Sequence, residues 1–269
     1  MTQSDKAFTG SIPALYDRYL GPMLFAPYAD DLAARVRALR PSRVLETAAG
    51  TGIVTRRLAE TLPGATQITA TDLNQAMIDT AAAKITLPGI TWQACDATQL
   101  PFAAATFDCV LCQFGVMFFP SKVDAFKEAR RVLKPGGTFL FSVWDKIEFS
   151  PISNTISDAV AALYPADPPN FLRRTPFGHH DVTIIRNQLG EAGFANIESF
   201  TVTLPSVCPT PRDAAVGQCH GSPLRSEIEA RDPNGLDAAT DATAAALAAH
   251  FGEGPINSTM QAIVFTAGG

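Results

Sequence analysis

The sequence predicts an α/β fold built on a doubly wound, mostly parallel sheet. Short β-rich segments alternate with helical ones between residues 43 and 143, and this alternation is typical of βαβ units. One of these segments, 107–112, is almost continuously apolar, as expected of a strand buried on both faces. The composition agrees, because 46% of the residues are hydrophobic and only 17% are charged, which favours a large buried core.

The first 40 residues are expected to form a helical cap. The apolar spacing from Ile12 to Leu39 is helical, with interruptions at Gly21–Pro22 and at Pro27. Because proline breaks the interior of a helix, we expect two or three short helices that end before Pro41.

Five strands with intervening helices are expected next. The helix after the first strand should end near residue 62, and a turn at Lys134-Pro135-Gly136-Gly137 should precede the fifth strand. The strands are predicted at 43–47, 67–71, 90–94, 107–112 and 138–143, and the later helices at 74–85 and 122–133.

The second half is predicted to complete the sheet. Residues 150–174 begin helical and become proline-rich, and a helix at 181–192 ends at Gly193. An Ala-rich helix is predicted at 237–250, because Ala has the highest helix propensity. Strands at 196–203 and 261–266 lie before and after that helix, with loops in the remaining segments.

Composition and charge exclude several classes of partner. The formal net charge of -5 disfavours nucleic acid, which is bound by clustered Lys and Arg. No apolar run approaches the ~20 residues of a membrane span, and the polar first ten residues do not resemble a secretory signal. Five scattered cysteines indicate reduced thiols, so we expect a cytoplasmic protein.

The most informative segment is the loop from Glu46 to Gly52 after the first strand, followed by Asp72 at the end of the second strand. Small residues allow a tight turn and a close approach of the backbone to a ligand. An acidic residue at the end of the next strand can accept two hydrogen bonds from a ribose diol. Together they favour an adenosine site, although glycine turns also end strands for purely structural reasons.

A third feature follows the third strand. Asp96 can accept a hydrogen bond from an adenine amino group, and the N–H group of Ala97 can donate to a ring nitrogen. The alternative is that Asp96 only caps the N–H groups of its own turn.

The ordered set of the Glu46 to Gly52 loop, Thr71-Asp72-Leu73, Asp96-Ala97, Phe107-Asp108 and Leu133-Lys134-Pro135-Gly136-Gly137 resembles the class I S-adenosylmethionine-dependent methyltransferases. Within that class it is most similar to the small-molecule branch that includes the ubiquinone and menaquinone biosynthesis methyltransferases. The resemblance covers about residues 40–145. It implies a seven-stranded Rossmann-like fold in a single domain, with a cap at 1–40, a cofactor-binding core at 41–146 and a substrate-selecting half at 147–269.

The resemblance implies S-adenosylmethionine as the cofactor. Glu46 would lie beneath the methionine amino group, Asp72 would bind the ribose, and Leu73 would cover the adenine. An N-terminal aromatic residue, Tyr16 or Tyr19, would close over the cofactor unless both tyrosines simply pack the cap. The cofactor-binding residues expected in this way are Tyr16, Tyr19, Glu46, Ala48, Gly50, Asp72, Leu73, Met77, Asp96, Ala97, Gln113 and Phe114.

Two positions depart from the family pattern. The family usually has Asp where Glu46 stands and Gly where Ala48 stands. A glutamate still supplies a carboxylate on a longer arm, whereas the methyl group of Ala48 is expected to crowd the loop.

The implied reaction is displacement at the methyl carbon of a sulfonium, which requires alignment and exclusion of water rather than a fixed catalytic triad. A base is needed only where the acceptor must lose a proton. The candidates are His179 and His180, which precede a predicted helix and could instead simply flank its start. Cys219–His220 is a second candidate. No metal is expected, since Cys109 and Cys112 point to opposite faces of one strand.

Two other functions stay open from sequence alone: a nicotinamide-dependent oxidoreductase and a non-catalytic S-adenosylmethionine-binding protein. The acceptor is expected to be a small molecule. Phe114, Met117, Phe118 and Phe119 could line a site for a flat apolar compound or could pack the core. A homodimer is compatible with the sequence.

Overall fold

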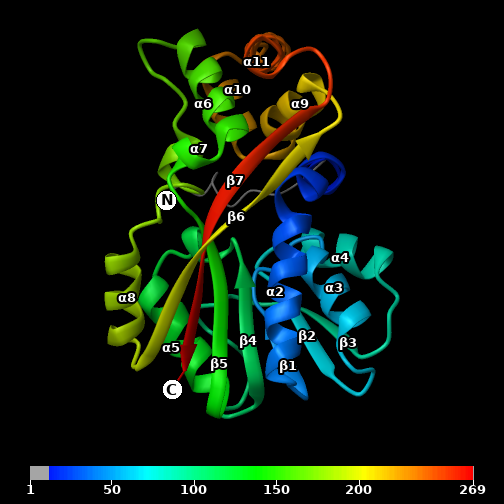
Figure 1. The fold of residues 1–269 in the computed structure, drawn as a ribbon, viewed down its shortest axis with the longest axis vertical. Coiled ribbons are helices and arrows are strands. Elements are labelled where there is room, and N and C mark those ends of the chain that lie inside the picture. The colour runs from blue at the N-terminus through cyan, green and yellow to red at the C-terminus, as the bar shows by residue number, and fades with distance from the viewer. Residues whose placement is uncertain (1–11, 269) are drawn as a thin grey trace. The chain divides into compact units, whose positions relative to one another are not determined.

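The computed structural model describes residues 12–268, which form two compact units (Figure 1). The first, here called the helical unit, comprises residues 12–27, 145–178 and 203–261. The second, the sheet unit, comprises residues 28–144, 179–202 and 262–268. These boundaries differ from the cap, core and substrate-selecting segments expected from the sequence, because the chain passes between the units several times.

The sheet has seven strands in the order β3-β2-β1-β4-β5-β7-β6. The first five run parallel, and β7 pairs antiparallel with β5. The doubly wound, mostly parallel fold is therefore confirmed. The strands are β1 (Arg43–Glu46), β2 (Gln67–Asp72), β3 (Ile90–Ala94), β4 (Phe107–Gln113), β5 (Leu133–Trp144), β6 (Asn196–Cys208) and β7 (Ile256–Gly268).

Both faces of the central strands are buried. On one face, helices α2 (Ala26–Leu39) and α3 (Ile53–Thr61) supply Leu32 and Leu58, which join Val44, Leu111 and other strand residues in one apolar cluster. On the other face, Phe139 and Phe141 of β5 stack on each other, and Phe265 stacks on Phe141. Phe126 contacts both β5 rings at an angle. Alternation along β5 sends Leu140 to the first face and its phenylalanine neighbours to the second.

The remaining helices of the sheet unit follow the strands as the sequence predicts. They are α4 (Gln75–Lys84), α5 (Lys122–Val132) and α8 (Val182–Glu191), and α5 packs against α8. The short η3 (Val116–Phe118) was not predicted. Helices α5 and α8 have side-chain N-caps: the Ser121 hydroxyl accepts from Asp124 N, and the Asp181 carboxylate accepts from Thr183 N and Ile184 N.

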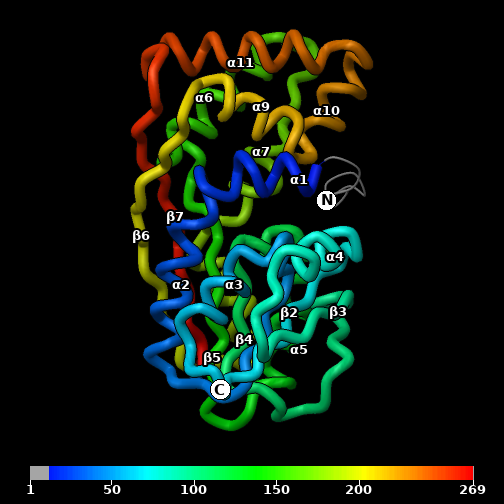
Figure 2. Tube along the Cα trace, turned by 90° about the vertical axis from the view of Figure 1, so that its right-hand side faces the viewer, coloured from blue at the N-terminus to red at the C-terminus, as the bar shows by residue number. Residues whose placement is uncertain are grey.

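The helical unit consists mainly of helices, with the end of β6 and the start of β7. Within it, α9 packs against α11 and η2, and α6 packs against α11 (Figure 2). Its elements are α1 (Ile12–Leu15), η2 (Tyr16–Phe25), η4 (Ile147–Phe149), α6 (Pro151–Leu163), α7 (Phe171–Arg174), α9 (Pro211–Gly221), α10 (Leu224–Arg231) and α11 (Leu236–Phe251). Helices α9 and α10 occupy residues expected to form loops, so that expectation was wrong.

The predicted helix breaks at Gly21–Pro22 and Pro27 were also wrong. Helical structure continues from Ile12 to Leu39 because η2 is a π-helix that contains Pro22. A π-helix bonds each N–H to the carbonyl five residues back, as Ala26 N does to Gly21 O. Its wider turn accommodates a proline ring that an α-helix would not.

The segment Lys134–Gly137 is an irregularity inside β5 rather than a turn before it. Phe107 pairs with Leu133 and Cys109 pairs with Thr138, so Asp108 alone lies opposite these four residues. Among residues 12–268, no helix is both long and apolar enough to span a membrane.

Candidate cofactor site at the carboxyl ends of the strands

The strand order places the candidate site beside β1. Chain connections run from β1 to β2 and β3 on one side, whereas β4 and β5 lie on the other. Ligands of doubly wound sheets bind at such a switch point, outside the carboxyl ends of the strands. Glu46 pairs with Ala70 of β2 and Leu111 of β4, so the ends of these three strands lie side by side.

The loop after β1 is fixed to both neighbouring strands. Thr47 N donates to Leu111 O at 2.9 Å, and Ala49 N donates to Thr71 O at 2.8 Å. Gly50 has φ +56°, and a methyl group placed on it would have no heavy atom within 4 Å. The loop therefore leaves open space in which a ligand can approach the backbone at Gly50.

Ala48 also has positive φ, at 53°. Its methyl group lies where Gly115, in the turn after β4, has no side chain: a Cβ on Gly115 would be 2.5 Å from the Ala48 Cβ. The family usually has glycine at the position of Ala48, and the additional methyl group is accommodated here because Gly115 has no side chain.

Glu46 is buried, with 1% of its surface exposed. Burial raises the pKa of its carboxyl to about 8, and the negative charge of Asp72 adds to this effect. The Thr55 hydroxyl opposes the shift by donating a 2.6 Å hydrogen bond to Glu46 Oε2. A carboxyl in this state gives up its proton when a cation is placed beside it.

Asp72 ties the second strand to the loop. Its Oδ2 accepts from Gly50 N at 2.9 Å and its Oδ1 accepts from Asn74 N at 2.8 Å. Burial raises the pKa of Asp72 despite these bonds. The next residue, Leu73, is 51% exposed at the strand end, whereas Met77 is buried on α4. An exposed leucine beside a carboxylate suits the face of an adenine ring.

Asp96 follows β3 and caps its own turn, which was the alternative to adenine binding. Its Oδ1 accepts from Thr98 N at 2.8 Å and from the Thr98 hydroxyl at 2.7 Å. The side chain is otherwise exposed, and Ala97 is half-buried. A capping role leaves the second oxygen of Asp96 available to a ligand.

The end of β4 carries an aromatic cluster. Gln113 pairs with Ser142 of β5. Phe114 has φ 51° and stacks on Trp144 with ring centroids 3.8 Å apart. Tyr28 meets both rings edge-on and donates its hydroxyl proton to Val202 O. Phe114 is therefore a buried member of this cluster, and Met117 is buried as well.

Tyr16 and Tyr19, which were expected to close over the cofactor, belong to the helical unit. Tyr16 stacks on Phe25 with centroids 4.8 Å apart, and the Arg18 guanidinium lies 5.0 Å from the centre of the Tyr19 ring. Their closure over a cofactor stays a prediction.

The histidine candidates occupy different environments. His179 is in the sheet unit, where burial, reinforced by the charges of Lys122 and His180, lowers its pKa to about 4. Its Nε2 is buried without a hydrogen-bond partner in the described part of the chain. His220 Nε2 lies 2.9 Å from the Thr240 hydroxyl, and His250 is in the last turn of α11.

Sequence reasoning missed two residues that fix the site. Thr55 binds the Glu46 carboxyl, and Thr71 donates its hydroxyl to Glu46 O at 2.9 Å. The signal available was a threonine in the first turn of the helix after the loop. Across residues 12–268, no group of three or more His, Cys, Asp or Glu side chains is arranged to hold a metal ion.

Two of the quoted motifs meet at the amino ends of β1, β4 and β5, opposite the candidate site. Asp108 Oδ2 accepts from Ser42 N and Arg43 N, at 3.0 and 2.8 Å, and Lys134 Nζ donates to Oδ1 at 2.7 Å. Asp108 therefore connects the start of β1 to β5, which is a structural role.

Comparison with known proteins agrees with this geometry. A family model described as a methyltransferase domain matches residues 45–141. The ubiquinone/menaquinone biosynthesis C-methyltransferase UbiE of Teredinibacter turnerae is 29% identical over 184 residues, which cover 61% of this chain and 72% of that protein. The enzyme of the same name from Klebsiella pneumoniae is 27% identical over 177 residues, covering 61% and 70%.

Solved structures share the fold. The YcgJ protein of Bacillus subtilis superimposes with a TM-score of 0.57 at 20% identity, covering 90% of this chain and 97% of that one. Haemonchus contortus phosphoethanolamine N-methyltransferase 2, solved with S-adenosyl-L-methionine, gives 0.60 at 17% identity, covering 99% and 60%.

The fold and the strand-end motifs define a Rossmann-like methyltransferase. Residues 45–141 carry the methyltransferase domain, and the protein is an S-adenosylmethionine-dependent methyltransferase similar to the UbiE enzymes. Its cofactor is S-adenosylmethionine, and neither the oxidoreductase nor the non-catalytic alternative is favoured.

Proposed function

We propose that the protein transfers the methyl group of S-adenosylmethionine to a small-molecule acceptor. The observation that carries the proposal is the pair Glu46 and Asp72, two buried carboxyl groups on neighbouring strands beside the open backbone of Gly50. The relatives named above act, by their names, in ubiquinone and menaquinone biosynthesis. The net charge of -5 also favours a small acceptor over nucleic acid.

The residues at the strand ends match the parts of the cofactor. Glu46, once ionised, holds the ammonium group of the methionine moiety. Asp72 binds the ribose hydroxyls, since each of its oxygens accepts one backbone N–H and keeps a lone pair for a further bond. Leu73 covers the adenine, and Asp96 with the N–H of Ala97 binds its edge.

When bound, the cofactor supplies an electrophilic methyl group on a cationic sulfur. The protein must align the acceptor with the methyl carbon and the sulfur, exclude water, and bind the cationic cofactor in preference to its neutral product. The acidic set Glu46, Asp72 and Asp96 provides that preference.

His179 is the proposed proton acceptor where the methyl acceptor must lose a proton. Its low pKa keeps the ring neutral at physiological pH, so one ring nitrogen carries no proton and can accept one. The buried Nε2 has no hydrogen-bond partner in the described residues. A base this weak suits acceptors with acidic protons.

Calorimetric titration with S-adenosylhomocysteine tests the cofactor site. Asp72→Ala should lower affinity at least about tenfold, because charge-assisted hydrogen bonds contribute ~1.5–3 kcal/mol. Asp72→Asn keeps the side-chain volume and should show the same direction of effect. Asp79→Ala, on the exposed face of α4, is the matched control and should bind normally.

Unchanged affinity in both Asp72 variants would refute the ribose assignment. Binding of NADH in place of S-adenosylhomocysteine would refute the proposed function itself. Circular dichroism of each variant separates loss of binding from loss of fold.

A further inference from the structure

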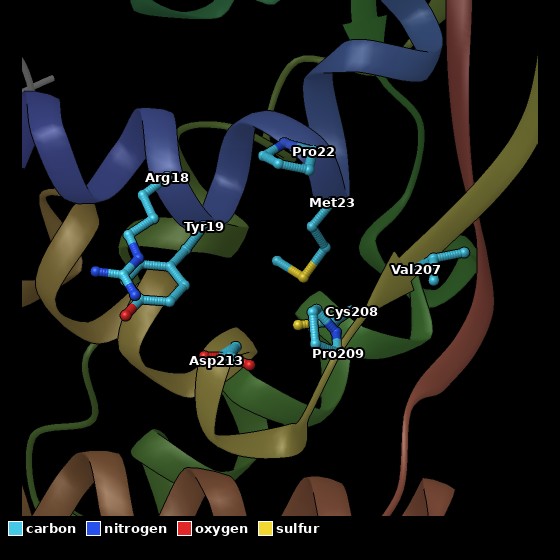
Figure 3. Close-up of a pocket in the computed structure, with 8 residues that line it drawn as sticks. All are labelled: Arg18, Tyr19, Pro22, Met23, Val207, Cys208, Pro209 and Asp213. Carbon is cyan, nitrogen blue, oxygen red and sulfur yellow. The ribbon is translucent and has the colours of Figure 1, made fainter.

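A second binding site lies entirely within the helical unit. A pocket of about 270 Å³ is formed by η2, the end of β6 and the first turn of α9 (Figure 3). None of the strand-end residues discussed above lines it. Its lining includes Met23 from η2 and Cys208 from β6, together with the charged side chains of Arg18 and Asp213.

The pocket has an apolar floor and fixed walls. Met23 and Cys208 are 1% and 2% exposed, so their sulfur-bearing side chains form a buried, polarisable surface. The Ser206 hydroxyl donates to Met23 O at 3.1 Å, which ties β6 to η2. A Cβ on Gly217 of α9 would be 2.9 Å from the Tyr19 Cβ, so α9 and η2 are in close contact. The cavity is therefore preformed.

The charges around the pocket are not equivalent. The Asp213 carboxylate accepts from the Thr210 hydroxyl at 2.7 Å in the first turn of α9, where the helix dipole stabilises a negative charge. The exposed Arg18 guanidinium lies beside the Tyr19 ring and makes no ion pair with any acidic side chain in residues 12–268. Asp213 is thus held at the start of α9, whereas the guanidinium of Arg18 can form an ion pair with an anionic ligand.

We propose that this pocket binds a small aromatic carboxylate as a second ligand of the protein. The ring would lie on Met23 and Cys208 beside Tyr19, and the carboxylate would pair with the Arg18 fork. At about 270 Å³ the pocket lies near the lower end of the ~300–1,000 Å³ typical of small-molecule sites, so it suits a small ligand.

Methionine methyl NMR tests the site in the full chain. The sequence has five methionines; Met23 reports on the pocket and Met77, on α4 of the sheet unit, reports on the strand ends. The sample is titrated with benzoate, with the neutral benzamide and with the cationic benzylamine, and separately with S-adenosylhomocysteine. Met→Leu variants assign the signals.

Benzoate should shift the Met23 signal and bind at least about tenfold more tightly than benzamide or benzylamine. Arg18→Gln should remove that preference, and Val207→Trp, at a half-exposed rim position, should block binding. Arg225→Gln, which removes a surface arginine paired with Glu229 in the same unit, is the matched control and should bind benzoate normally.

The two proposals fail separately. If S-adenosylhomocysteine shifts Met77 while benzoate leaves Met23 unchanged, the pocket assignment is wrong and the methyltransferase proposal stands. Equal binding of the three probes, or benzoate binding unaffected by Arg18→Gln, also overturns the pocket assignment. If S-adenosylhomocysteine shifts no methionine and releases no heat, the proposed function is wrong.

Discussion

The methyl group of Ala48 lies against the backbone of Gly115. The two residues come from the loops after β1 and β4, and a Cβ on Gly115 would be 2.5 Å from the Ala48 Cβ. The class that this chain resembles usually has glycine at the position of Ala48. The additional methyl group and the absent side chain at Gly115 are therefore complementary, and they connect the loops on either side of the switch point.

This pair predicts a specific energetic coupling. Gly115→Ala should destabilise the protein by ~1–3 kcal/mol, because the new methyl group would overlap both Ala48 and the Cys112 sulfur, 2.7 Å away. Ala48→Gly should have little effect by itself, since it removes strain at φ 53° but adds freedom to the unfolded chain. Denaturant unfolding of each variant measures these changes.

The double variant is the control for that coupling. Ala48→Gly combined with Gly115→Ala should recover about 1 kcal/mol or more of the loss, while the contact with the Cys112 sulfur keeps recovery incomplete. Strictly additive effects would show that the two loops do not contact each other in this way.

Glu46 predicts proton release on cofactor binding. With its pKa near 8, the carboxyl is mostly protonated at pH 7 and must ionise to hold an ammonium group. Binding of S-adenosylhomocysteine at pH 7 should therefore release about one proton, measured as a difference in calorimetric enthalpy between phosphate and Tris buffers. The release should fall towards zero near pH 9, where the group is already ionised.

The raised pKa of Glu46 also determines how the free energy of unfolding changes with pH. The folded-state pKa lies above the unfolded value of 4.5, so the folded chain binds more protons between these values. The contribution of Glu46 to stability without ligand therefore decreases as pH rises from about 4.5 to about 8. Glu46→Gln should abolish both effects, whereas Glu60→Gln on the surface of α3 should leave them intact. Buffer-independent enthalpies in the wild-type protein would contradict the assignment.

The strand segments and the acidic strand ends could be predicted because the signals for them are local. The Glu46 to Gly52 loop, Asp72 and the apolar run of β4 each appear within a few residues of sequence. The π-helical segment around Pro22 could not be predicted, because proline favours a break unless packing stabilises the wider turn. Helices α9 and α10 were missed since their apolar positions show little helical periodicity.

The contacts that stabilise the site depend on residues distant in sequence. Thr55 reaches Glu46 only because α3 folds back beside β1. The partner of Ala48 is Gly115, and nothing in the sequence near Ala48 identifies it. Side-chain roles of this kind follow from tertiary packing, so a motif comparison finds the loop but not what holds it in place.

Asp108 predicts a loss of stability without a loss of cofactor affinity. Asp108→Ala removes the acceptor of Ser42 N and Arg43 N and the partner of Lys134, so unfolding free energy should fall by ~1–3 kcal/mol. Lys134→Met removes only a partly exposed charge and should cost less than ~1 kcal/mol. Both variants should bind S-adenosylhomocysteine with wild-type affinity, because Asp108 lies at the amino end of β4 and the candidate site lies at the carboxyl ends of the strands.

The pH dependence of this effect follows from the Asp108 carboxyl. Partial burial pushes its pKa upward, but the Lys134 ammonium and the N–H groups of Arg43 and Ser42 hold the pKa below its ordinary value. Its stabilisation is therefore present above that ordinary pKa and is lost as pH falls through the folded-state value. The difference in unfolding free energy between the wild type and Asp108→Ala should thus narrow in acid, while Asp79→Ala should match the wild type throughout. A weakened cofactor affinity in Asp108→Ala would instead show that the amino end of β4 is coupled to the strand ends that hold Glu46 and Asp72.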